Sequence, residues 1–292
     1  MVTRLLISVV SYSGLIMRDI FHIKPKYQSI TQGSIITGCI ADEISINNVW
    51  GCIITARCDL DNKKVQRVHY LPIISFDDWL KYCASTSIRE AWKKSLFSHL
   101  RNALKNHGLS PSFMSKGLSR SDLEIIIDSF FNKKEVKSFW EAYDNLSLSD
   151  SIPLSEIINS PQGNGILKQE IDRLINNENS NYYLIEDWRN NSAASFMVVL
   201  LRDIKAISIE CAFNLPDGIF EDDVEDPFFS INDLKQTTNR SCFYYVDSEI
   251  KSPFIEHIVQ RFSSNFSRIG VEDLPKAEVL EQLIDYSKEF LK

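Results

Sequence analysis

The stretch that decides the fold is VWGCIITARCDLD, residues 49–61, in which an apolar run ends in a cysteine followed by an aspartate. An almost continuous apolar run of this length is typical of a strand that is buried on both faces. The residues that follow, DLDNKK (59–64), are rich in Asp and Asn, which favour turns. The sequence therefore predicts a central strand that runs into a polar turn.

Strand patterns continue on both sides of this stretch. The next segment, VQRVHYLPIIS (65–75), predicts the second strand of a hairpin, with Pro72 marking its edge or end. Further strands are predicted from β-branched, aromatic and alternating apolar residues at RLLISVVSYSG (4–14), QGSIITGCIADEISI (32–46), NYYLIED (181–187), SFMVVLLRDIKAISIEC (195–211) and RSCFYYVDSE (240–249).

Helical spacing begins at Ser75, which with Asp78 has the spacing of an N-cap and a capping box. A helix that ends at Gly108 follows from five residues at every fourth position, Ile88, Trp92, Leu96, Leu100 and Leu104. Helices continue to about residue 179, with a break at PQGN (161–164). A C-terminal helix starting at about residue 252 is predicted from the stripe Phe254, Ile258, Phe262, Phe266 and Ile269, and a last helix covers 273–292.

This order of elements predicts an α+β fold. We expect a curled antiparallel sheet or small β-barrel whose strands come from both ends of the chain, interrupted by a helical insertion and followed by C-terminal helices. The predicted parts are residues 1–75, 76–178 and 179–292. Two separate domains are the alternative.

The charge is unevenly distributed along the chain, whose net charge is −7. Residues 1–118 carry 15 Lys and Arg against 8 Asp and Glu, whereas residues 119–292 carry 17 against 31. A basic first third is suited to nucleic acid or to an acidic protein partner. Alternatively, the two parts of the chain dock on each other, or the basic residues are solvated.

The six cysteines form no C-x-x-C motif, which favours reduced thiols in a cytoplasmic protein. No run is apolar enough to cross a membrane, and the first 19 residues are interpreted as a strand rather than a signal peptide. No metal site is predicted, because the closely placed Cys and His residues lack zinc-knuckle spacing and the acidic run 220–228 is more typical of a solvated or docking loop. No nucleotide, dinucleotide or serine-hydrolase motif occurs, so no cofactor is predicted.

A candidate site surrounds the Cys58-Asp59 pair. Arg57 would favour a thiolate at Cys58, and His69 on the next strand could act as its base. If the protein is a nuclease, Arg57, Asp59 and His69 are the candidate catalytic residues. The structural alternative is that Cys58 packs as a small apolar residue and Asp59 bonds the backbone of the turn.

A second candidate binding site lies on the C-terminal helix, where His257, Arg261 and Arg268 flank the apolar stripe. The two arginines are seven residues apart and so share one side of a helix. They could hold a phosphate or a carboxylate of a partner, or they could be solvated.

The order QGSIIT, VWGCIITARCDL and VQRVHYLPII resembles the first part of the small barrel of PemK/MazF-type toxins. The segments 55–60 (TARCDL), 182–184 (YYL) and 252–270 (SPFIEHIVQRFSSNFSRIG) are similar to uncharacterised bacterial proteins that carry an S/T-x-x-C-D-[IL] segment. The toxins have an Arg-Pro before the buried strand, where this chain has Asn47-Asn48-Val49-Trp50, so ribonuclease activity does not follow from the resemblance. The second group implies a setting among mobile or host-defence genes.

These observations predict a non-enzymatic, protein-binding component of a bacterial toxin–antitoxin or anti-phage defence system. The alternatives are an RNA-directed toxin or nuclease built on a PemK/MazF-like barrel, and a nucleic-acid-binding module that uses residues 1–118. A neighbour-encoded protein is the expected partner.

Overall fold

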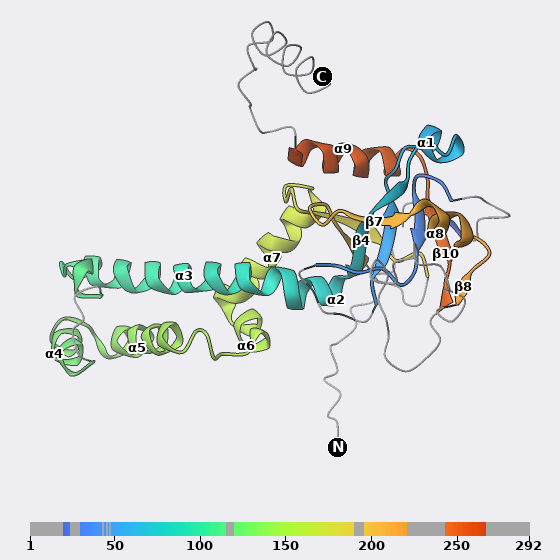
Figure 1. Ribbon diagram of the computed structural model, residues 1–292. Helices are drawn as coiled ribbons and strands as arrows, with labels where there is room; N and C mark the ends of the chain where they lie inside the picture. The colour runs from blue at the N-terminus through green and yellow to red at the C-terminus, as the bar shows by residue number, and fades with distance from the viewer. Residues whose placement is uncertain are drawn as a thin grey trace, which may run out of the picture.

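The fold was obtained from a computed structural model, which describes residues 20–23, 30–42, 44, 46, 48–114, 120–189, 196–220 and 243–266. The fold is α+β, as predicted, with a curled antiparallel sheet and a helical insertion between its fourth and fifth strands (Figure 1). Two segments predicted as a strand (4–14) and a helix (273–292) lie outside the described residues. None of the helices in the described part of the chain is long and apolar enough to span a membrane.

Eight strands form the main sheet, in the order β1-β10-β2-β3-β4-β6-β5, with β7 also paired to β4. Strand β10 from the C-terminal part lies between β1 and β2 from the N-terminal part, so the two ends of the chain share one sheet. A separate two-stranded sheet is formed by β8 and β9. The strands are β1 (Phe21–Ile23), β2 (Ser34–Ile36), β3 (Trp50–Ile53), β4 (Arg67–Ser75), β5 (Tyr182–Glu186), β6 (Phe196–Leu200), β7 (Lys205–Ser208), β8 (Ile219–Phe220), β9 (Phe243–Tyr244) and β10 (Val246–Ile250).

The helical segments are α1 (Arg57–Asp61), α2 (Phe76–Asp78), the π-helical turn η1 (Trp79–Ala84), α3 (Ser85–Asn106), the 3₁₀ turn η2 (Pro111–Met114), α4 (Arg120–Phe130), α5 (Lys133–Ser147), α6 (Leu154–Asn159), α7 (Pro161–Ile175), α8 (Ile209–Asn214) and α9 (Phe254–Phe266). The helices between residues 76 and 178 and helix α9 were predicted in outline from the apolar spacing, whereas α1 and α8 were not.

The central strands are buried on both faces because side chains alternate between two hydrophobic cores. On β4, Leu71 and Ile73 belong to the core that α9 covers with Ile255 and Ile258. Tyr70 and Ile74 belong to the larger core on the other face, which continues into the helices.

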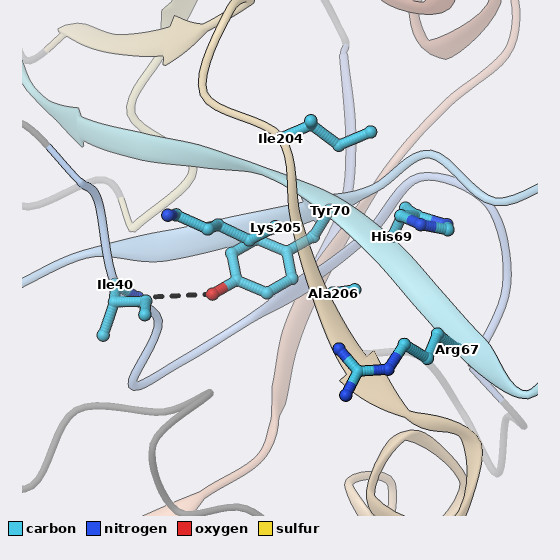
Figure 2. A pocket seen from close by; sticks show the side chains of 7 residues that line it. All are labelled: Ile40, Arg67, His69, Tyr70, Ile204, Lys205 and Ala206. Atoms are coloured by element: carbon cyan, nitrogen blue, oxygen red, sulfur yellow. Dashed lines mark hydrogen bonds between the residues drawn. The ribbon is translucent and has the colours of Figure 1, made fainter.

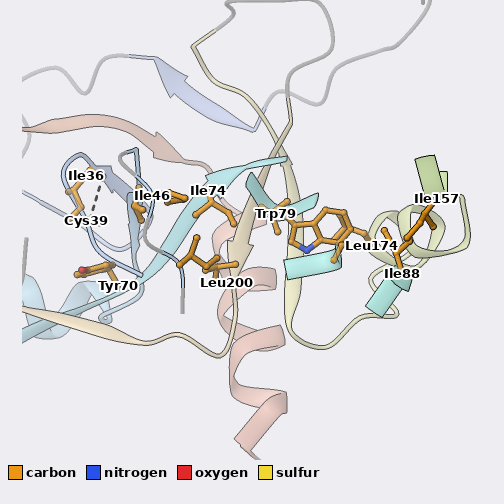
Figure 3. Close-up of a cluster of buried hydrophobic side chains, with 14 of the residues drawn as sticks. Ile36, Cys39, Ile46, Tyr70, Ile74, Trp79, Ile88, Ile157, Leu174 and Leu200 are labelled. Carbon is orange, nitrogen blue, oxygen red and sulfur yellow. Dashed lines mark hydrogen bonds between the residues drawn. The ribbon is translucent and has the colours of Figure 1, made fainter. Parts of the chain in front are cut away.

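The helices from α3 to α7, residues 85–175, form what we call the helical arm (Figure 1). Helix α3 extends away from the sheet, α5 lies alongside it and α4 lies at the far end. Trp79 is buried where the arm meets the sheet. Figure 3 shows it between Ile74 and Leu200 of the sheet and Ile88 and Leu174 of the arm. The arm and the sheet therefore share one continuous core.

The predicted helix signals at Ser75 and Gly108 are confirmed, at the start of α2 and just after the end of α3. Ser75 accepts a hydrogen bond from the backbone N–H of Asp78 at 3.0 Å and also donates its hydroxyl to that carboxylate at 2.6 Å. The five predicted apolar residues of α3 are all buried. Gly108 ends the helix with φ +70°, a left-handed conformation that glycine adopts without steric cost.

Several predicted boundaries were wrong. The segment 195–211 is not one strand, since β6 and β7 are separated by a turn and α8 starts at Ile209. The predicted break at 161–164 is the first turn of α7, with Ser160 as N-cap and Pro161 in the first turn, where its missing N–H costs nothing. The apolar stripe of α9 is shifted, because Ile255 and Ile258 are buried whereas Phe266 is exposed.

Candidate functional site

Residues 57–61 form the short helix α1, which replaces the first part of the polar turn predicted at 59–64, and residues 62–63 form a turn. Leu60 is fully buried and anchors α1 to the larger core, which leaves Arg57 and Cys58 exposed. The thiol of Cys58 lies 3.6 Å from a carboxylate oxygen of Asp59. The structural alternative is not observed either, because Cys58 is exposed and, among the described residues, no hydrogen bond joins the Asp59 side chain to the backbone of the turn.

His69 lies on β4, across from the end of β3. Its backbone N–H donates to the hydroxyl of Thr55 at 2.7 Å, and its carbonyl accepts from the N–H of Ile54 at 2.9 Å. Its ring is exposed on the face of the sheet that α9 covers further along. Among the described residues, no hydrogen bond or ion pair joins His69 to Arg57 or Asp59.

A pocket of about 410 Å³ lies beside His69 (Figure 2). It is lined by Ile40, Arg67, His69, Tyr70, Ile204, Lys205 and Ala206. In the antiparallel β4–β7 pair, His69 is opposite Ala206 and Arg67 is opposite Ser208. Arg67 and His69 therefore project from the same side of this strand pair. Of the residues that line the pocket, only His69 was predicted as a site residue from the sequence.

Lys205 contributes little free charge to this pocket. Its ammonium group pairs with Asp42 and lies 3.5 Å from a carboxylate oxygen of Asp203. Burial acts to lower the pKa of Lys205, but the hydrogen bond to Asp42 and the charges of both carboxylates outweigh it, so the net shift is upward. Tyr70 accepts a hydrogen bond from the N–H of Ile40 at 3.4 Å, and burial raises its pKa far above the ordinary value. The pocket is lined by two cations, Arg67 and Lys205. Unlike Lys205, Arg67 forms no ion pair with any of the described residues.

His257 and Arg261 attach α9 to the β5 end of the sheet. The Nδ1 atom of His257 lies 3.0 Å from the hydroxyl of Tyr183, and Nη2 of Arg261 donates to the carbonyl of Asn179 at 2.9 Å. These contacts favour a structural role for both residues. Arg268, the third predicted member, lies outside the described residues.

The structure does not bring the two predicted sites together. Arg57, Cys58 and Asp59 lie on α1, which follows β3, and His69 lies on the adjacent β4. The partners of His257 and Arg261 are on and just before β5. Among the described residues, no hydrogen bond or ion pair joins these two groups of side chains.

A third cluster, around Arg189, was missed by sequence reasoning. The guanidinium of Arg189 forms a bidentate pair with the buried carboxylate of Asp187, at 2.8 and 2.7 Å. It also lies 4.3 Å from the ring centroid of Trp50. Trp188 donates its indole N–H to Asp247 at 2.8 Å. The adjacent D-W-R letters at 187–189 were the available signal, since this composition suits a cation–π and carboxylate clamp.

No group of three or more His, Cys, Asp or Glu side chains among the described residues is placed to hold a metal ion. Most of the acidic run 220–228 lies outside these residues. The described cysteines are free, and burial raises the pKa of Cys52 to about 12, which makes that thiol unreactive.

Comparison of the chain with models of protein families, with curated proteins and with solved structures found no match. Function is therefore inferred from the residues and their arrangement.

Proposed function

We propose that this protein is a non-enzymatic, protein-binding component of a bacterial toxin–antitoxin or anti-phage defence system, with the helical arm as its binding element. The observation that carries this proposal is the distribution of exposed apolar side chains. Nine large apolar side chains are exposed in the described part of the chain, and six of them lie within residues 76–178, a range that holds about half of the described residues. Those six are Tyr82, Phe97, Ile125, Phe130, Leu148 and Ile175.

Contiguous exposed apolar surface marks protein–protein interaction sites, and we propose that a partner buries the exposed apolar side chains of the arm. The two on the distal helix α4 are the most informative, since Ile125 is 70% exposed and Phe130 is 55% exposed. Helix α4 itself is fixed to α5 by Arg120, which pairs with Asp144 at 2.6 Å and lies 4.8 Å from the ring of Trp140. A partner would therefore meet a preorganised helix, which lowers the entropic cost of binding. The defence setting is supported by the sequence resemblance described above.

The test begins with the full chain, tagged and purified from the cell that encodes it. The expected result is a stoichiometric partner that is identified by mass spectrometry and forms a binary complex after both proteins are purified. The double variant Ile125→Asp, Phe130→Asp should weaken this complex by about tenfold or more, because burying two carboxylates in an apolar interface is costly.

The matched control is Ile204→Asp, which changes an exposed apolar residue in the turn between β6 and β7, outside the arm. The Ile204→Asp variant should bind the partner with the same affinity as the wild-type protein. A complex that is insensitive to both arm substitutions, or a chain that forms no binary complex, would exclude the proposal.

A second candidate is an RNA-directed toxin, favoured by the pocket beside His69. Arg67 and His69 offer a cation and a titratable ring on one side of the β4–β7 pair, and Arg57 is exposed on the nearby α1. If the protein is an RNA-directed toxin, its expression should arrest growth, and His69→Ala or Asp59→Ala should relieve the arrest. Arrest that neither substitution relieves, or no arrest at all, removes this candidate.

A further inference from the structure

The solvent-facing side of α3 carries a basic stripe, which we define as Lys94, Phe97, Arg101 and Lys105. One residue advances about 100° around a helix, so Lys94, Arg101 and Lys105 fall within about 40° of one another and opposite the buried line through Leu96 and Leu100. All four members of the basic stripe are exposed. The three cations extend over about 16 Å of helix, at about 1.5 Å per residue.

The cations of the basic stripe differ from other cations on the arm in their pairing. Lys93 pairs with Glu90 and Asp150 at 3.0 and 2.7 Å, and Arg120 pairs with Glu124 and Asp144. For Lys94, Arg101 and Lys105, the described residues provide no carboxylate partner. The guanidinium of Arg101 lies 5.8 Å from the ring centroid of Phe97, which is 39% exposed. The stripe thus combines unneutralised charge with an apolar centre.

We propose that the basic stripe binds an acidic segment of a partner protein, an inference that rests on the proposed function and specifies the chemistry of the partner. Three cations over about 16 Å match an extended peptide of about five residues, at about 3.3 Å per residue. Arginine forms bidentate pairs with carboxylates, and Phe97 offers an apolar surface for a side chain between the acidic residues. The segment is therefore rich in Asp and Glu, with at least one apolar residue.

An acidic protein fits this surface better than nucleic acid does. The distal helix α4 exposes Asp122 and Asp128, which would repel a continuous phosphate backbone that follows the arm. The stripe is also short, whereas proteins that track phosphates commonly neutralise six or more of them.

The experiment measures fluorescence anisotropy of a labelled synthetic peptide with the sequence Asp-Glu-Leu-Glu-Asp and its amide counterpart Asn-Gln-Leu-Gln-Asn, each titrated with the full chain. Binding is measured at about 50 and about 300 mM salt, since surface charge pairs weaken as the Debye length shortens. The wild-type protein should bind the acidic peptide and not the amide peptide. The triple variant Lys94→Glu, Arg101→Glu, Lys105→Glu should weaken binding by about tenfold or more, because three attractions become repulsions.

The control variant Lys64→Glu, Lys168→Glu, Arg202→Glu makes the same change in net charge at exposed cations outside α3, for which the described residues show no ion pair. It should bind like the wild-type protein. Equal losses in both triple variants would mean that net charge alone attracts the peptide, and this would overturn the inference. Absent or salt-independent peptide binding would also overturn it.

Two further measurements test whether a different molecule occupies the basic stripe. Tighter binding of a labelled single-stranded RNA, lost in the stripe variant, would assign the stripe to nucleic acid. A wild-type dimer in sedimentation that becomes a monomer in the stripe variant would assign it to a second copy of the chain. Either outcome overturns the proposal.

The result is separable from the test of the proposed function. A binary complex that is lost in the α4 variant but unchanged in the stripe variant keeps the protein-binding function and rejects this surface. If no binary complex forms, the proposed function fails, and the peptide titration still decides whether the stripe recognises acidic chains.

Discussion

At the scale of single residues, Arg189 shows how one side chain connects distant strands. It follows β5, pairs with the buried Asp187 and covers the ring of Trp50 on β3. Its neighbour Trp188 packs edge-on against Trp50 at 5.9 Å and bonds Asp247 on β10. The contacts around one arginine therefore connect three strands that are not consecutive in the sheet.

The first prediction concerns the geometry of this pair. Arg189→Lys keeps the charge but removes the planar fork that contacts both carboxylate oxygens of Asp187 and the Trp50 ring. We expect the free energy of unfolding to fall by about 1–3 kcal/mol, since a buried carboxylate loses part of its pairing. Urea denaturation measures this change. The control Arg202→Lys alters an exposed arginine and should leave stability within about 0.5 kcal/mol.

The second prediction follows from the pKa of Asp187. Burial acts to raise this pKa, but hydrogen bonds from the side chain and backbone of Arg189 outweigh it and hold the pKa below its ordinary value. A depressed carboxyl pKa stabilises the fold above the unfolded-state pKa of about 3.9 and loses that contribution as the pH falls through the folded-state pKa. The stability gap between wild type and Asp187→Asn should therefore narrow as the pH is lowered from about 6 to about 3. Denaturation curves across this pH range measure the difference in free energy of unfolding between the two proteins. A difference that stays constant would contradict the prediction.

Residue-level expectations at the candidate site depended on the backbone conformation of residues 57–61. The composition of 59–64 indicated a turn, because Asp and Asn favour turns, but a buried Leu60 is compatible with a short helix as well. Local composition cannot tell these two apart, since the difference lies in whether Leu60 reaches a core that is built mostly from later parts of the chain. Tertiary contact decided the conformation, and with it the exposure of Cys58.

At the scale of elements, the α6–α7 pair depends on a close approach of backbones at Gly163. A Cβ atom placed there would lie 1.8 Å from the carbonyl oxygen of Ile157 in α6. Gly165, two residues later in the same helix, has nothing within 4 Å of its would-be Cβ atom. These two glycines therefore have different roles, although both stand in α7.

The third prediction uses this pair as a matched test. Gly163→Ala should lower the free energy of unfolding by about 1–3 kcal/mol or more, because α6 and α7 must move apart. Gly165→Ala should raise it by up to about 1 kcal/mol, because alanine has the higher helix propensity. Thermal denaturation of both variants measures the two signs. Two changes of the same sign would mean that the close contact at Gly163 does not constrain the helices.

Most elements could be predicted from the sequence, because helix periodicity and capping are local. The N-cap of α2 at Ser75, the α3 helix and its end at Gly108 are examples. Pro72 could not be placed correctly, since proline normally indicates a strand edge. It lies inside β4 because β7 pairs with residues 67–70 and β6 with residues 73–75 on the same side, which leaves position 72 without a partner there. The change of pairing partner along β4, from β7 to β6, depends on the arrangement of the whole sheet and cannot be predicted from the local sequence.

At the scale of the whole molecule, the arm is not a separate body joined by a linker. The larger core runs without interruption from sheet residues such as Ile74 and Leu200 through Trp79 to Leu100 and Leu104 in α3. Trp79 is 1% exposed and packs edge-on against Tyr182 of β5 at 5.9 Å. The apolar pattern predicted the helices and the strands separately, but their common core depends on the angle at which the chain passes through the π-helical turn that begins at Trp79.

The last prediction tests whether the arm and the sheet unfold together. Trp79→Ala should lower the free energy of unfolding by about 3–5 kcal/mol and separate one cooperative transition into two, because the cavity lies where the two parts meet. Far-UV circular dichroism follows the helices of the arm. Trp92 and Trp140 lie in the arm, so both proteins carry Trp92→Phe and Trp140→Phe, and the fluorescence of Trp50 and Trp188 then follows the sheet. The two signals should coincide in the wild-type protein and diverge in the variant. Trp79→Phe is the control. It keeps most of the ring, and it removes a buried indole N–H that has no hydrogen-bond partner among the described residues. Its transitions should remain coincident. A Trp79→Ala protein that still unfolds in one step would show that other contacts couple the arm to the sheet.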